Sequence, residues 1–339
     1  MFKNEKYNIF FSVWLIGLIT LVASIIIVGG LTRLTDSGLS ITKWEVFKGI
    51  LPPLNEAQWE KYFSEYKSIP QYVLLNTGMS LEEFKIIFYW EYFHRILGRL
   101  IGLIFFIPFI FLLYKKILNK YLIIRLVFLS ILILLQGFIG WFMVKSGLVD
   151  NVSVSHFRLS LHLTTAFIIF SSLIWLFMNH YYQMKKNFMQ INSEFIFLKI
   201  LLFLIFLQIV VGAFVSGLDA GKIYQTWPLM NGNYFPSDDF LNNLFNFKDP
   251  SFVQFIHRNI AYVIFGLSIY TGVFIYKKKI TELYNLYLFF IFFIAMQILL
   301  GILVLYSNVN IYFASLHQIS SIFLIVSSLF LYYRSIKTE

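Results

Sequence analysis

The chain of 339 residues contains no cysteine, and only 13% of its residues are charged. Without cysteine it can form no disulfide, ligate no haem through a thiolate and hold no iron–sulfur cluster. The low charge content excludes an ordinary soluble domain, in which about a quarter of the residues are charged. Acidic residues are scarcer than basic ones, 17 against 27, and the basic residues form short clusters between apolar runs. Such clusters are typical of topology signals and lipid anchors, so no nucleic-acid partner is expected.

Long apolar runs fill most of the remaining sequence: 59% of the residues are hydrophobic, and the mean hydropathy is +0.74. A helix needs about 20 residues to cross about 30 Å of hydrocarbon, and a backbone in lipid must pair its own polar groups. The sequence therefore predicts an all-α integral membrane protein with eight transmembrane helices. The eight runs lie near residues 9–31, 85–114, 121–145, 156–178, 195–216, 252–276, 284–306 and 311–333.

Clusters of lysine and arginine mark one side of this eight-span arrangement. The positive-inside rule makes that side cytoplasmic, with both termini inside. The opposite face carries two long loops, 32–84 and 217–251, and residues 54–66 are expected to form a short amphipathic helix on the membrane surface. The basic residues are Lys3, Lys6, Lys115, Lys116, Lys120, Lys185, Lys186, Lys277, Lys278, Lys279, Arg334 and Lys337.

Polar and glycine positions of the first half recur in the second half in the same order. An internal repeat of four spans gives both copies the same orientation, so we expect two tandem four-helix bundles, 1–184 and 185–339. A pseudo-two-fold axis along the membrane normal would relate them. The matched pairs are Gly29 and Gly212, Asp36 and Asp219, Gly38 and Gly221, Trp44 and Trp227, His94 and His257, Arg95 and Arg258, Gln136 and Gln297, Gly140 and Gly301, and His162 and His317.

Four histidines obey the repeat and lie at a similar depth, about 5–10 residues from the outer ends of their spans. Polar residues inside a membrane are costly and mark function, although a single histidine is also explained by a hydrogen bond between helices. Two facing imidazoles per bundle suit the two axial positions of a haem iron, whereas zinc or copper needs more ligands. The simplest pairing joins His94 with His162 and His257 with His317.

Cations near the outer face are candidate partners for the propionates of a haem, because guanidinium groups match carboxylates. The alternative is that these side chains reach the lipid headgroups. Two further histidines stand outside the repeat: His156 is expected at the membrane interface without a metal, and His180 at the cytoplasmic surface. The propionate-binding candidates are Arg95, Arg99, Arg158 and Arg258.

Glu91 is the asymmetric position, because Gln254 stands at the matching place in the second half. It precedes His94 by three residues, so both lie on one face of their helix. One interpretation is a structural ion pair with Arg95. The other is a carboxylate that stabilises positive charge or accepts a proton beside a haem in the first half. The asymmetry then predicts chemistry in the first half and electron transfer in the second.

Over nearly its whole length the chain resembles the heme A synthase family. The resemblance rests on GGLTRLTDSGLSITKWEVFKGILPP (29–53), EYFHRILGRLIG (91–102), FRLSLHL (157–163), FVQFIHRN (252–259) and SLHQ (315–318). It implies oxidation of a ring methyl of heme O to a formyl group through successive hydroxylations, which gives heme A for terminal oxidases. It also implies that His94 and His162 hold the substrate haem, with Glu91 as the catalytic carboxylate. His257 and His317 would then ligate the iron of a haem b cofactor.

The family also implies partners and a location. Heme O would come from a heme O synthase, and electrons would leave to a partner that the sequence does not identify. Membrane lipid surrounds the spans, and a homo-oligomer is left open. The chain resembles the cysteine-free branch of the family, which is found in alphaproteobacteria and mitochondria. The lack of a transit peptide favours the bacterial inner membrane. Two other classes stay open: a two-haem cytochrome b that only carries electrons, and a transporter with parallel repeats.

Overall fold

The computed structural model describes residues 5–44, 48–149, 151–190, 193–236 and 244–336. Eight of its helices are long and apolar enough to cross a membrane, and each overlaps one of the eight predicted runs. All named elements in the described ranges are helical, which confirms the all-α fold class. The chain forms two compact units, Met1–Leu173 and Ile174–Glu339.

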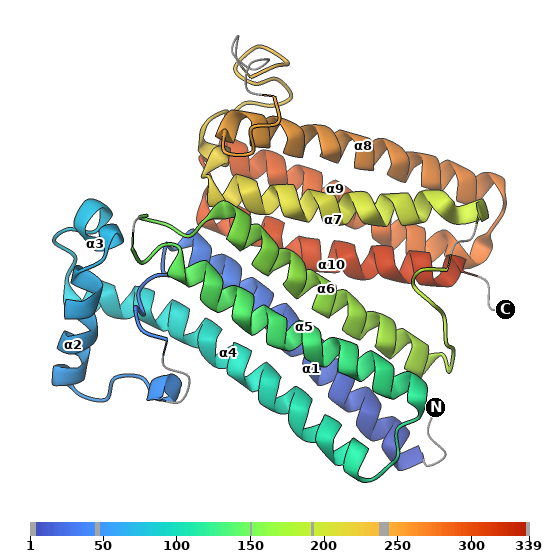
Figure 1. Cartoon of the computed structure of the whole chain (residues 1–339). Coiled ribbons are helices and arrows are strands. Elements are labelled where there is room, and N and C mark those ends of the chain that lie inside the picture. Colours follow the sequence, from blue (N-terminus) through green and yellow to red (C-terminus); the bar gives the residue numbers. More distant parts are fainter. Residues whose placement is uncertain (1–4, 45–47, 150, 191–192, 237–243, 337–339) are drawn as a thin grey trace. The chain divides into compact units, whose positions relative to one another are not determined.

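The first unit contains α1 (Glu5–Leu34), α2 (Glu56–Lys67), α3 (Pro70–Leu75), α4 (Leu81–Tyr114), α5 (Lys120–Lys145) and the larger part of α6 (His156–Tyr181). Helix α1 packs along α4, and α4 contacts α5. Figure 1 shows these long helices running alongside one another, with the short helices α2 and α3 at one end of α4. Short 3-10 turns also occur in the chain: η1 (Lys48–Ile50), η2 (Ser193–Phe195), η3 (Ala220–Lys222) and η5 (Thr281–Leu283).

Helix α4 begins at Leu81, a turn earlier than the apolar run indicates. The cause is a capping box, in which the Ser80 hydroxyl accepts the Glu83 N–H and the Glu83 carboxylate accepts the Ser80 N–H. Polar caps likewise start two other spans: Asn119 accepts the Leu122 N–H before α5, and Asp249 caps α8. Local capping, rather than hydropathy, therefore sets these boundaries.

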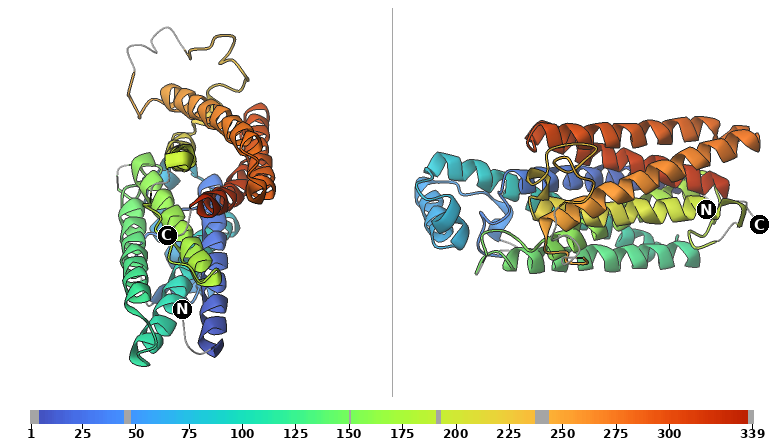
Figure 2. Two further views of the ribbon diagram at one scale, coloured as in Figure 1. Left: turned by 90° about the vertical axis from the view of Figure 1, so that its right-hand side faces the viewer. Right: turned by 90° about the horizontal axis from the view of Figure 1, so that it is seen from above.

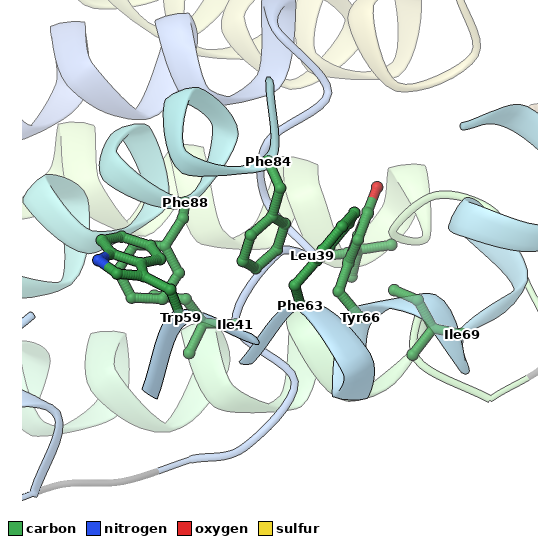
Figure 3. Close-up of a cluster of buried hydrophobic side chains, with 8 residues drawn as sticks. All are labelled: Leu39, Ile41, Trp59, Phe63, Tyr66, Ile69, Phe84 and Phe88. Atoms are coloured by element: carbon green, nitrogen blue, oxygen red, sulfur yellow. The ribbon is translucent and has the colours of Figure 1, made fainter. Parts of the chain in front are cut away.

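An outer cap covers one end of α4; it consists of residues 36–44, α2 and α3. Helix α2 forms as predicted, but its apolar face is buried against α4 and the 36–44 segment instead of lying on a membrane surface. Each large apolar side chain buried in this way contributes about 1.5–3 kcal/mol. Figure 3 shows the cluster that results, which consists of Leu39, Ile41, Trp59, Phe63, Tyr66, Ile69, Phe84 and Phe88.

Tyr66 lies at the centre of this cluster and is fully buried. Its hydroxyl donates to Gln71 Oε1 at 3.0 Å and accepts from Asn76 Nδ2 at 2.6 Å. Burial raises the pKa of this hydroxyl, so it stays protonated and can act as a donor. Gln71 Nε2 in turn donates to the carbonyl of Asp36 at 2.9 Å, which ties the cap to the exit of α1.

The second unit contains the end of α6, then α7 (Ile196–Gly217), α8 (Pro250–Lys277), α9 (Tyr284–Tyr306) and α10 (Ile311–Ser335). Helix α7 packs on α8 and α9 on α10, and further contacts join α8 to α9 and α7 to α10. These contacts form a closed ring, so the four helices make a four-helix bundle. Helices α8 to α10 are seen grouped in both views of Figure 2.

The end of α6 differs from expectation in two ways. The two units divide inside this helix rather than at residues 184–185, because its last turns pack on α10: the rings of Trp175 and Tyr333 are 5.1 Å apart. His180, expected at the surface, is buried with 2% of its area exposed. The segment after α6 folds back over the helix end, where the Lys186 N–H donates to Asn179 Oδ1 at 2.9 Å and Asn179 Nδ2 donates to the Lys186 carbonyl at 3.0 Å.

Candidate functional site

Each repeat histidine lies on the second helix of a helical hairpin and packs against a glycine of the first helix. A Cβ atom added to the glycine would lie between 2.9 and 3.3 Å from Cε1 of the imidazole. That spacing leaves no room for a side chain unless the ring moves. The sequence repeat of glycine and histidine is therefore a repeat of one physical contact. The four pairs are Gly29 and His94, Gly140 and His162, Gly212 and His257, and Gly301 and His317.

Three of the four hairpins also carry a glutamine one helical turn before the glycine. Its Nε2 donates to the main-chain carbonyl of the histidine, at 2.9–3.0 Å. Sequence comparison of the two halves identified two of these glutamines but missed Gln208. The signal that finds it is the spacing of four residues between glutamine and glycine, which all three share. The contacts join Gln136 to His162, Gln208 to His257 and Gln297 to His317.

The structure brings the rings of His94 and His162 close together inside the first unit. Their ring centroids are 6.2 Å apart, with the planes at 59°. A metal–imidazole bond is about 2.0–2.1 Å long, and Nε2 lies about 1.1 Å from the ring centre, so two rings binding one metal from opposite sides have centroids about 6.2–6.4 Å apart. The pair therefore has the separation that a two-sided axial site requires.

The second pair, His257 and His317, lies inside the second unit, on α8 and α10. In both units the Nδ1 atoms are buried and find no hydrogen-bond partner among the described residues. Across these residues no three histidine, aspartate or glutamate side chains gather as a metal cluster. Two imidazoles without a third ligand fit an iron porphyrin, which supplies four equatorial nitrogens itself, and do not fit a zinc site.

Glu91 is buried, with 3% of its area exposed, and all its partners come from the first unit. Its Oε1 accepts from Arg95 at 2.6 and 3.0 Å. Its Oε2 accepts from the Ser40 hydroxyl at 2.7 Å and from the Ile41 N–H at 2.9 Å. Four hydrogen bonds, two of them from the charged guanidinium of Arg95, fix the position of this carboxylate. The expected ion pair with Arg95 is thus present, one turn from His94.

Arg95 and Arg258 make the same contacts in their own units. Arg95 donates to the carbonyls of Ile41 at 2.9 Å and Lys43 at 3.3 Å. Arg258 donates to the carbonyls at the matching positions, Tyr224 and Thr226, at 2.9 and 2.8 Å. Both guanidiniums therefore hold the chain segment that follows the first helix of the unit. These two propionate candidates are engaged with the protein's own backbone.

The other two candidates lie elsewhere in the first unit. Arg99 lines a small cavity together with Lys43, Tyr92 and Arg95. The cavity has a volume of about 20 Å³, which is room for one water molecule. Arg158 donates to the Phe142 carbonyl at 2.7 Å, and its guanidinium lies over the ring of that phenylalanine, 3.7 Å from the centroid.

Gln254, the counterpart of Glu91, is also buried, and its Nε2 donates to the Tyr224 carbonyl at 2.9 Å. The segment after the first helix is thus held in both units, by a carboxylate in one and by an amide in the other. His156 begins α6, where its ring packs 4.1 Å from that of Phe157, and it belongs to neither histidine pair.

The fold and these contacts define a class: a polytopic helical membrane protein with an intramembrane histidine pair in each of two units. The model of a family described as cytochrome oxidase assembly protein matches residues 12–329. The chain is 49% identical over 340 residues to a heme A synthase of Pelagibacter ubique, covering 98% of each chain. It is 41% identical to heme A synthases of Flavobacterium psychrophilum and Rickettsia bellii, covering 98% and 92% of this chain and 99% and 94% of theirs. The chain belongs to the heme A synthase family.

Proposed function

We propose that the chain oxidises a ring methyl of heme O to the formyl group of heme A, with the substrate held between His94 and His162. Family membership makes the chain an oxidoreductase that acts on heme O. The observation that supports this site is the separation of the two rings, 6.2 Å, which matches one iron bound from both sides.

His257 and His317 would hold a haem b in the second unit. Such a haem would supply one-electron transfer, and the reaction needs an outlet for electrons: forming a formyl group from a methyl group and the oxygen of water (CH3 + H2O → CHO + 4 H+ + 4 e−) releases four electrons, which must reach an acceptor. The chain's own residues keep this second site free of a carboxylate: Gln254 stands where Glu91 stands in the first unit. The amide of Gln254 is neutral, so the second unit lacks the carboxylate that Glu91 supplies in the first.

Glu91 would act through its fixed negative charge. Because four hydrogen bonds hold the carboxylate in place, positive charge that develops on the substrate one turn away would be stabilised without any reorientation of the carboxylate. Arg95 and Ser40 keep the group in place. In this proposal the ion pair between Glu91 and Arg95 holds the carboxylate that does the chemistry, so the two interpretations of Glu91 are compatible.

We further propose a bacterial inner-membrane location with both termini in the cytoplasm. The support is the asymmetry of basic residues, which cluster at the ends of the spans that share a side with the termini. The outer cap and the histidine pairs would then belong to the periplasmic half. Heme O synthase and an electron acceptor are the partners that this reaction requires.

Extraction of the bound pigments tests the proposal. The chain is produced in membranes that also make heme O, purified, and its haems are identified by mass. Heme O, its hydroxylated form or heme A, together with protoheme, is the expected result. A two-haem electron carrier would yield protoheme alone, and a transporter would show no Soret band.

Gly29→Ala is expected to weaken haem binding in the first unit. The new Cβ would lie 2.9 Å from Cε1 of His94, so the imidazole must shift from its position in the structure. Loss of a ligand's support costs about tenfold or more in metal affinity. Gly17→Ala is the matched control, because a Cβ at that position of α1 has no neighbour within 4 Å. Titration with hemin, followed in the Soret band, measures both; equal affinities for the two variants would contradict the contact's role.

A further inference from the structure

The four hairpins differ in one respect at the level of the histidines. In three of them a glutamine donates to the main-chain carbonyl of the histidine, and we call this hydrogen bond a brace. In the first hairpin the residue one turn before Gly29 is Ile25, which has no donor. His94 is therefore the one repeat histidine without a brace, whereas Gln136 braces His162 and both ligands of the second unit are braced.

A brace fixes more than the spacing of two helices. The carbonyl can only accept, so the amide nitrogen must face the histidine. The same nitrogen lies 3.4 Å from Nε2 of His162 and, for Gln208, 3.3 Å from Nε2 of His257. The hydrogen bond to the main-chain carbonyl and the close approach to the ring therefore hold both the backbone and the imidazole of these histidines against the facing helix.

Ile25 occupies the place where the first hairpin would carry its brace. Its Cδ1 lies 3.7 Å from the position of a Cβ on Gly98, four residues after His94. An isoleucine contributes apolar packing there but cannot donate a hydrogen bond to the main chain of His94. At the same distance from His162 stands Ala166, which is larger than Gly98 and still leaves room for Gln136. The absence of a glutamine at residue 25 is therefore not forced by crowding.

We propose that Ile25 leaves His94 the more weakly held axial ligand of the first site, so that haem enters and leaves there. The braces of Gln208 and Gln297 would retain the haem of the second site. The inference rests on the proposed function, in which the first site must release its product and the second keeps its cofactor. One braced and one unbraced imidazole give a site that binds haem and still exchanges it.

Haem transfer to excess apomyoglobin tests this without any turnover. The purified full chain is loaded with hemin, and its release is followed optically. Wild type is expected to release haem in a fast and a slow phase, and His94→Ala, which lacks the fast phase, assigns that phase to the first site. Ile25→Gln is expected to slow the fast phase about tenfold and to leave the slow phase unchanged. Gln208→Leu is expected to accelerate the slow phase by a similar factor.

Ile25→Leu is the matched control, because it stays apolar and should release haem as wild type does. If Ile25→Gln does not assemble, Gln136→Leu gives the opposite test and should accelerate the fast phase. An unchanged fast phase in an assembled Ile25→Gln protein, or in Gln136→Leu, overturns the brace argument alone. Absence of any fast phase in wild type, with a His94→Ala spectrum like that of wild type, overturns the substrate site itself.

Discussion

His257→Ala is expected to abolish haem b binding while haem binding in the first unit persists. The substitution leaves His317 as a single axial ligand. Loss of a residue that only supports a ligand can lower affinity by roughly 100-fold, so loss of the ligand itself should lower it at least as much. Oxidation of heme O should stop as well, because electrons have no route out of the first site. Extracted protoheme, measured per chain, is the direct readout, and His94→Ala should show the opposite pattern.

The fold is expected to tolerate this change, because the main-chain carbonyl that accepts from Gln208 remains and alanine is a good helix former. Added imidazole should restore low-spin haem in the space that the side chain vacates, which separates lost ligation from misfolding. His156→Ala is the control: it also removes a histidine of a spanning helix, but one outside both pairs, and both haems should remain. Retention of protoheme by His257→Ala would contradict the assignment of the second site.

The eight spans could be predicted from the sequence because they rest on a simple physical requirement. Helices that cross lipid need long apolar runs whose backbone pairs its own polar groups. The repeat matched Gly29 with Gly212 and His94 with His257, but it did not predict that each glycine packs against the histidine of its own unit, because that contact depends on how the helices pair in space.

The role of the arginines could not be predicted in the same way. Arg95 and Arg258 stand near the outer face, where a haem propionate and a backbone carbonyl are equally good partners for a guanidinium. The backbone contacts seen in the structure depend on the path of the segment after the first helix, which for Arg95 is set by long-range packing of the outer cap. The carbonyl of Ile41 comes within 2.9 Å of Arg95 although the two residues are far apart in sequence.

The difference between Glu91 and Gln254 was visible in the sequence, but its physical meaning was not. Both side chains hold the segment after the first helix, and both lie one turn before a histidine–arginine pair. Since a neutral amide serves that structural purpose in the second unit, structure alone does not require a charge in the first. We therefore expect the carboxylate to have a purpose beyond holding the segment.

Glu91→Gln is expected to lower heme A formation by about 10²–10³-fold, the usual effect of removing one preorganised electrostatic group, with both haem sites still filled. The second unit already has glutamine, Gln254, at the position that matches Glu91. There an amide donates to the carbonyl of Tyr224, and Arg258 holds the same segment, so glutamine at residue 91 can donate to the Ile41 carbonyl in the same manner. Heme A and heme O are measured by extraction from membranes that supply heme O.

Ser40→Ala is the matched control for this variant. It removes one of the hydrogen bonds to the same carboxylate, at a cost of about 1.5–3 kcal/mol of stability, but leaves the charge and the three other donors in place. Its heme A output should fall less than tenfold. If the glutamine variant were as active as wild type, Glu91 would only hold the outer segment. If Ser40→Ala were equally inactive, the position of that segment, and not the negative charge, would govern the oxidation.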